Sequence, residues 1–155
     1  LQTMKTLVVL AATVVAVAAI DECPGIYIPV GTSCYFFSES MKNWNESLTY
    51  CEEINPGGYT SALAHVDQCS QLGALAAYIG NNLDVVDYWI GGTDEEKEGV
   101  YRWHSTGDLI PVEVPFWYPG QPDGYVSENH LSLSKTGYFA DEKGSLLQKF
   151  ICQLL

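Results

Sequence analysis

The chain has 155 residues, of which 19 are Asp or Glu and only 7 are Lys or Arg, so its formal net charge is -12. This balance argues against nucleic acid as a partner, because phosphate binding needs clustered Lys and Arg. An acidic surface suits a protein that holds cations, although solubility alone also explains it.

The N-terminal residues have the pattern of a secretory signal. Lys5 precedes an apolar run over residues 6–19 that ends in small residues suited to signal peptidase. The run is shorter than the about 20 residues that span a bilayer, so a membrane anchor is the less favoured alternative. We therefore assign residues 1–19 to upstream sequence and a signal peptide. Residues 20–155 are expected to form one secreted, extracellular domain with no membrane insertion.

Short strands and two helices are predicted in the first part of this domain. Aromatic residues in loose alternation predict a strand over Val30–Phe37. Apolar residues at helical spacing predict a helix over Asn43–Ile54, which the turn residues at 55–58 stop. The same criteria predict a strand over Ala62–Val66, a helix over Gln68–Asn81 and a strand over Tyr88–Gly92.

The segment from Thr93 to Glu128 is turn-rich, acidic and aromatic. Loop regions of this length inside a compact domain are usually functional. Strand signals return over His130–Ser134 and Lys149–Gln153, with Gly137–Ala140 between them. A single α+β domain accounts for all of these elements.

Five cysteines in a secreted chain imply disulfides with one thiol left over. Their spacing suggests that Cys23 and Cys34 close an N-terminal hairpin, and that Cys51 and Cys152 tie the first helix to the last strand. Cys69 then remains unpaired. It is either a buried small side chain or the link in a disulfide-bonded dimer.

The long loop contains Gln121-Pro122-Asp123, which is followed by Glu128 and later by Asp141. Carboxylate and amide oxygens are the ligands that a hard cation such as calcium prefers. Binding residues are also concentrated on loops. The sequence therefore predicts a calcium site at this loop.

Several motifs occur in a fixed order along the chain. They are Cys23-Pro24 with Cys34-Tyr35-Phe36; Trp44 seven residues before Cys51; Ala62-Leu63-Ala64; Trp89-Ile90-Gly91-Gly92; Glu98-Gly99 with Trp103; Gln121-Pro122-Asp123; and Phe150-Ile151-Cys152. In this order and spacing the chain resembles the C-type lectin-like domain family in its long form, and more narrowly the secreted innate-immune lectins of arthropods. The resemblance implies two helices flanking small antiparallel sheets, with a long loop region that binds ligand.

The resemblance also implies roles for the loop residues. Those that match the principal calcium and sugar site are Gln121, Asp123, Glu128 and Asp141, with a cis peptide bond before Pro122. Gln-Pro-Asp, in place of Glu-Pro-Asn, resembles the galactose-type versions of the site. An aromatic ring often stacks on the sugar in such sites, and Tyr125 or Trp117 is the candidate here. The alternative is that Tyr125 covers the loop core, and for Trp117 a core position is favoured.

A second, auxiliary calcium site is also implied. Asp94 and Glu98 match acidic ligands of that site and Asn129 is a candidate third ligand, while Gly124 stands where another carboxylate is usual. The alternative is a solvated acidic turn.

The chain departs from the family pattern in two places. Ala140 stands where the family has an asparagine, so one ligand is lost and we expect weaker calcium affinity or altered selectivity. The family's inner disulfide would fall near His130 and Gly144, and neither is cysteine. We expect His130 to be a packed strand residue.

The expected function is a secreted, calcium-dependent lectin of galactose type that recognises microbial glycans in innate immunity and agglutinates cells if multivalent. The alternative is a domain of the same fold that has lost sugar binding and contacts a protein, which Ala140 and the missing inner disulfide favour modestly. The chain has no nucleophile elbow and no His-Glu-x-x-His motif, so we expect no catalytic residues and no enzyme. Asn45-Glu46-Ser47 is a glycosylation sequon.

Overall fold

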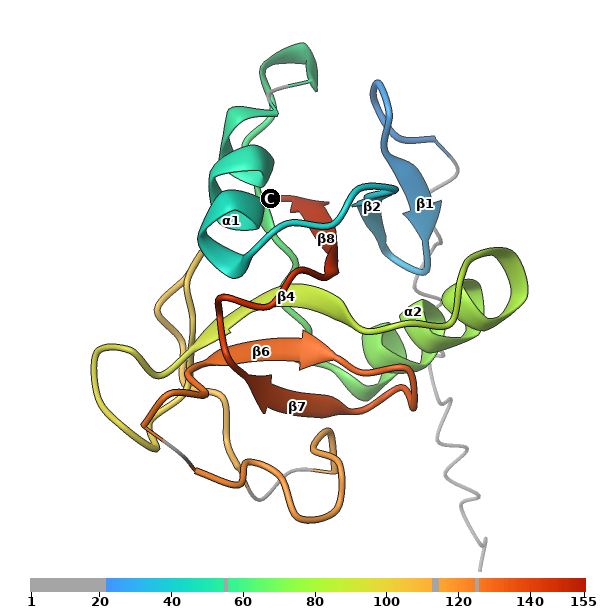
Figure 1. The fold of residues 1–155 in the computed structure, drawn as a ribbon. Helices are drawn as coiled ribbons and strands as arrows, with labels where there is room; N and C mark the ends of the chain where they lie inside the picture. The colour runs from blue at the N-terminus through green and yellow to red at the C-terminus, as the bar shows by residue number, and fades with distance from the viewer. Residues whose placement is uncertain (1–21, 55, 113–114, 125) are drawn as a thin grey trace, which may run out of the picture.

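The computed structural model describes residues 22–54, 56–112, 115–124 and 126–155. The predicted signal peptide and Tyr125 lie outside these residues. Figure 1 shows helix α1 beside strand β8, helix α2 on the other side of the molecule, and long loops beyond β6 and β7. In the part of the chain that is described, no helix has the length and apolar character needed to cross a membrane.

The strands form one mixed sheet in the order β1-β2-β8-β4-β6-β7, with β3 paired to β8 and β5 paired to β4. The strands are β1 (Ile28–Val30), β2 (Ser33–Phe37), β3 (Ser61–Leu63), β4 (Tyr88–Thr93), β5 (Arg102–Trp103), β6 (His130–Leu133), β7 (Phe139–Glu142) and β8 (Lys149–Leu154). The α+β fold class is confirmed. The expectation of separate antiparallel sheets was wrong in one respect, because β4 and β8 pair in parallel through Tyr88 and Trp89 and join the two halves.

Both predicted helices are present within about one residue of their expected ends. Helix α1 (Trp44–Glu53) begins with a capping box, in which Asn43 Oδ1 accepts from the Glu46 N–H at 2.9 Å and the Glu46 carboxylate accepts from the Asn43 N–H at 3.3 Å. This pairing satisfies two backbone donors that a helix start leaves free. Helix α2 (Cys69–Asn82) buries Leu72, Leu75 and Ile79 along one face.

The N-terminal strand prediction was wrong in its extent. A turn at Gly31, where φ is 63°, divides the predicted strand over Val30–Phe37 into the end of β1 and all of β2. Glycine adopts this left-handed conformation without the steric cost that a Cβ adds. The result is a hairpin, which the Cys23–Cys34 disulfide joins to the segment before it.

The core contains the tryptophans expected to pack there, and both expected disulfides are present. Trp44, Trp89 and Trp103 are at most 2% exposed. The Cys51–Cys152 disulfide ties α1 to β8 across a sequence separation of 101 residues. Cys69 is free and exposed, which excludes the buried alternative for its side chain.

Candidate metal centre

Three carboxylates from different parts of the chain meet where the long loop returns to the sheet. Asp123 and Glu128 lie on the loop before β6, and Asp141 lies in β7. Their ligand oxygens lie within 4.8 Å of one another, and among the described residues no other set of three acidic, histidine or cysteine side chains converges in this way. Asp141 is only 3% exposed, whereas Asp123 is exposed. The group therefore has a fixed, buried base and an open side.

The Asp141 carboxylate is held by three hydrogen bonds. Oδ1 accepts from the Asp123 N–H at 3.2 Å, and Oδ2 accepts from the Gly124 N–H at 3.4 Å and from the Tyr101 hydroxyl at 3.0 Å. An ionised carboxylate offers about four acceptor positions, so roughly one remains, on Oδ1. This remaining position is available to a cation.

Gln121 connects the tripeptide to the same strand. Its side-chain Oε1 accepts from the backbone N–H of Asp141 at 3.0 Å, and its backbone N–H donates to the Tyr118 carbonyl at 2.8 Å. The Gln121–Pro122 peptide bond is cis, as the resemblance implied. An amide oxygen has two lone pairs, so Gln121 keeps one for a further ligand.

The three carboxylates repel one another when no cation lies between them. Burial raises the pKa of the Glu128 carboxyl, and the neighbouring Asp123 and Asp141 raise it further. A cation between the carboxylates would remove this repulsion. The donor set is all oxygen, which fits calcium better than zinc or copper. The residues that would hold it are Gln121, Asp123, Glu128 and Asp141.

Asp94 and Asn129 lie together near the start of the long loop. The Asp94 N–H donates to the Asn129 carbonyl at 3.2 Å, and Asp94 Oδ2 accepts from the Gly99 N–H at 2.7 Å. The other oxygen, Asp94 Oδ1, and the Asn129 Oδ1 are both buried without a hydrogen-bond partner in the described part of the chain. Buried oxygens without partners are rare in folded proteins, and a bound ion is one explanation. Glu98 is exposed and does not complete a group of three carboxylates with Asp94 in the described chain.

Of the two aromatic candidates, Trp117 is described and Tyr125 lies outside the described residues. Trp117 is 6% exposed and packs on Tyr101, with ring centroids 5.0 Å apart, so its faces belong to the core. Tyr118 is 46% exposed and adjoins the tripeptide through its carbonyl. Sequence reasoning missed Tyr101, whose hydroxyl contacts Asp141, because no motif distinguishes it from a core tyrosine.

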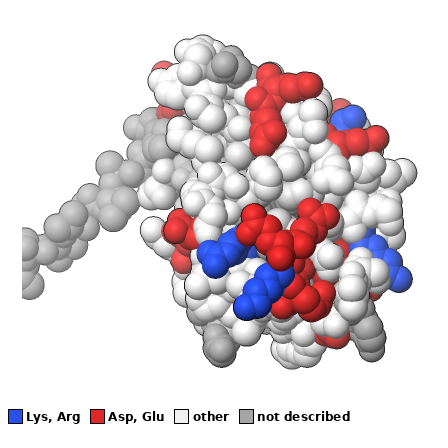
Figure 2. All heavy atoms as spheres, turned by 90° about the vertical axis from the view of Figure 1, so that its left-hand side faces the viewer, with Lys and Arg blue, Asp and Glu red and all other residues white. Residues whose placement is uncertain are grey.

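Acidic side chains gather on one face of the molecule. Figure 2 shows Asp and Glu side chains gathered on the side of the molecule that lies to the left in Figure 1, with a few Lys or Arg side chains beside them. Such a surface attracts cations and repels polyanions.

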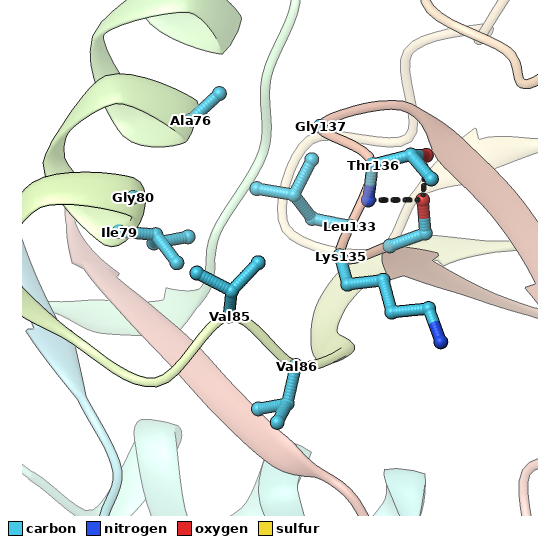
Figure 3. Close-up of a pocket in the computed structure, with 10 residues that line it drawn as sticks. Ala76, Ile79, Gly80, Val85, Val86, Leu133, Lys135, Thr136 and Gly137 are labelled. Atoms are coloured by element: carbon cyan, nitrogen blue, oxygen red, sulfur yellow. Dashed lines mark hydrogen bonds between the residues drawn. The ribbon is translucent and has the colours of Figure 1, made fainter.

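A separate crevice of about 130 Å³ lies between α2 and the turn that joins β6 to β7. Figure 3 shows Ile79, Val85 and Leu133 pointing toward one another across it, while Val86, which also lines it, points away from them. Its polar groups are the Ser134 and Thr136 hydroxyls, which bond each other at 2.6 Å, and the Lys135 side chain. It shares no residue with the carboxylate group and offers no acidic ligand.

Comparison with known proteins gives a consistent result. The Lectin C-type domain profile matches residues 40–154. C-type lectin domain family 17, member A from Homo sapiens is 30% identical over 131 residues, which cover 84% of this chain and 32% of that protein. The C-type lectin galactose-binding isoform from Pseudechis porphyriacus is 28% identical over 138 residues, covering 84% of this chain and 82% of that protein. The chain thus spans about a third of the human relative.

Solved structures are similar in fold. The crystal structure of the C-type lectin CEL-I from Cucumaria echinata has a TM-score of 0.75 and 23% sequence identity, covering 87% of this chain and 99% of that chain. At this identity the similarity confirms only the arrangement of helices and strands. A function for this chain has to be inferred from the residues of its carboxylate group.

Proposed function

The chain belongs to the Lectin C-type domain family, and from this premise we propose that it is a secreted, calcium-dependent lectin with a preference for galactose-type sugars. Members of the family are non-enzymatic carbohydrate-binding proteins, so no residue of this chain is given a catalytic role. The observation that carries the proposal is the convergence of Asp123, Glu128 and Asp141 beside Gln121. The ion would be held by these four side chains and would accept sugar hydroxyls as further ligands.

The galactose preference rests on the order of Gln121 and Asp123 around Pro122. In Glu-Pro-Asn the carboxylate comes before the proline and the amide after it, whereas here the amide comes first. The hydrogen-bond donor and the acceptor that face the sugar hydroxyls therefore exchange places around the ion. The relative from Pseudechis porphyriacus that is described as galactose-binding supports this choice. Tyr125 is proposed as the ring that stacks on the sugar, and Asp94, Glu98 and Asn129 as ligands of an auxiliary calcium ion.

A protein-binding domain without sugar affinity is the second candidate. Ala140 favours it, because this residue is 9% exposed and supplies no polar ligand beside Asp141. Calcium titration by calorimetry, followed by titration with galactose and then mannose, separates the two functions. Calcium binding with a galactose response supports the lectin, and the absence of any sugar response from calcium-loaded protein would favour the protein-binding domain.

The remaining proposals concern the whole secreted molecule. The exposed thiol of Cys69 would link two copies into a dimer, and two sugar sites on one particle would permit agglutination of microbial cells in innate immunity. Asn45 is exposed in the first turn of α1 and is proposed to carry a glycan. Non-reducing electrophoresis and glycosidase treatment of the secreted protein test these two proposals.

A further inference from the structure

Tyr101 is a buried residue at the base of the carboxylate group. It follows the acidic turn at residues 94–99 and is 2% exposed. Its ring meets the edge of Trp117, with centroids 5.0 Å apart and an angle of 65° between the planes. A ring packed in this way has little freedom to turn, so its hydroxyl is held at one place.

The hydroxyl of Tyr101 contacts both parts of the chain that supply the carboxylates. It donates to Asp141 Oδ2 in β7 at 3.0 Å, and it lies 3.3 Å from the Glu128 carbonyl oxygen on the loop before β6. The other donors to the Asp141 carboxylate are backbone N–H groups at 3.2 Å and 3.4 Å. Among the described residues Tyr101 is therefore the only side chain that donates to this carboxylate, and its bond is the shortest of the three.

We propose that Tyr101 is a positioning residue for the calcium site, which fixes the Asp141 carboxylate before the ion binds. This inference rests on the proposed function. The Tyr101 hydroxyl occupies one acceptor position of Oδ2 and the Asp123 N–H one of Oδ1, so the carboxylate is held in one orientation while an acceptor position on Oδ1 remains free. It also offsets part of the repulsion that pushes Asp141 away from the other two carboxylates.

Partners of this kind matter because a ligand that is already oriented loses less freedom when the metal binds. Removing a group that orients a metal ligand typically weakens metal affinity by about 10–100-fold. Burial raises the pKa of the Tyr101 hydroxyl, and Asp141 raises it further, so the group remains a hydrogen-bond donor. The contribution of the Tyr101 hydroxyl to calcium affinity is therefore expected to be constant over the neutral pH range.

The test is a calcium titration of Tyr101→Phe by calorimetry. This substitution removes only the hydroxyl and keeps the ring against Trp117. Tyr88→Phe is the matched control, because Tyr88 is 1% exposed and its hydroxyl donates to the Asp84 carbonyl at 3.0 Å, away from the carboxylates. We expect Tyr101→Phe to raise the Kd for calcium about tenfold, and Tyr88→Phe to leave it unchanged.

Two further readouts separate positioning from general stability. The melting temperature in chelator should fall no more for Tyr101→Phe than for Tyr88→Phe, and galactose affinity at saturating calcium should match that of the wild type. A calcium Kd within twofold of the wild type would overturn this inference alone, as would an equal loss of calcium affinity in both variants. A wild-type protein that binds no calcium would overturn the proposed function and this inference with it.

Discussion

The imidazole of His130 lies directly against the backbone of Gly144. A Cβ atom at position 144 would come within 2.6 Å of His130 Nδ1 and 2.7 Å of Cε1. The His130 ring also packs against Trp44, with centroids 4.4 Å apart, and its Nε2 lies 3.2 Å from Glu95 Oε1. A histidine packed on a glycine thus occupies the two positions where the family resemblance would put a disulfide.

This contact predicts a cost for any side chain at position 144. Gly144→Ala should lower the free energy of unfolding by about 1–3 kcal/mol, because the imidazole, which packs against Trp44, must shift to admit a Cβ atom. Gly80→Ala is the matched control, since a Cβ there meets no atom within 4 Å and alanine favours the helix by about 0.5–1 kcal/mol. Denaturant unfolding measures both variants. Equal stability of Gly144→Ala and wild type would contradict the packing described.

The same pair of positions should accept the disulfide. The Cβ at position 144 would lie 3.2 Å from His130 Cγ, so the two Cβ atoms would be less than about 5 Å apart, close to the range that a disulfide requires. His130→Cys with Gly144→Cys should form a bridge and add about 3 kcal/mol for a closed loop of roughly 15 residues. Mass spectrometry of non-reduced peptides detects the bridge. Persistent free thiols at both positions would show that the two backbones are farther apart.

Asp123 provides the clearest test of the proposed ion site, because it is exposed and belongs to the three-carboxylate group. Asp123→Asn should leave the melting temperature in chelator unchanged or slightly raised, since one repelling charge is gone. Excess calcium should stabilise the wild type by about 2.7 kcal/mol at 100 times its Kd, and the variant much less. Glu53→Gln, at the end of α1, controls for the loss of one charge. The same calcium-induced rise in Asp123→Asn and wild type would contradict the assignment.

Exchanging the amide and carboxylate of the tripeptide should change the preferred sugar. Gln121→Glu combined with Asp123→Asn keeps one charge and one amide, and a glutamate at 121 can still accept from the Asp141 N–H. The preference is expected to shift from galactose toward mannose by roughly tenfold or more, because the two affinities change in opposite directions. Competition by the free monosaccharides for an immobilised ligand measures the shift. An unchanged order of preference would exclude control by this tripeptide.

The sequence predicted best the elements whose signals are local. Asn43 and Glu46 mark the start of α1 through their capping box, and the apolar spacing in α2 marks its buried face. The Gln121-Pro122-Asp123 string likewise drew attention to the loop that contacts Asp141, because carboxylate and amide side chains can be recognised from their residue types alone.

Features that depend on distant partners were not predictable in this way. The parallel pairing of β4 with β8 joins Tyr88 to Lys149, and nothing in either strand specifies that partner. Strand β5 consists of Arg102 and Trp103 alone, which is too short for a periodic signal. The bond from Tyr101 to Asp141 spans 40 residues and requires the folded sheet to bring the two together.

The measurement that tests the central claim most directly is retention of the domain, residues 20–155, on immobilised galactose and on immobilised mannose, each in calcium and then in chelator. The account predicts retention on galactose in calcium, release by the chelator, and passage through the mannose column. Retention on mannose alone would contradict the galactose preference while keeping the lectin. Passage of folded protein through both columns in calcium would contradict the proposed sugar site.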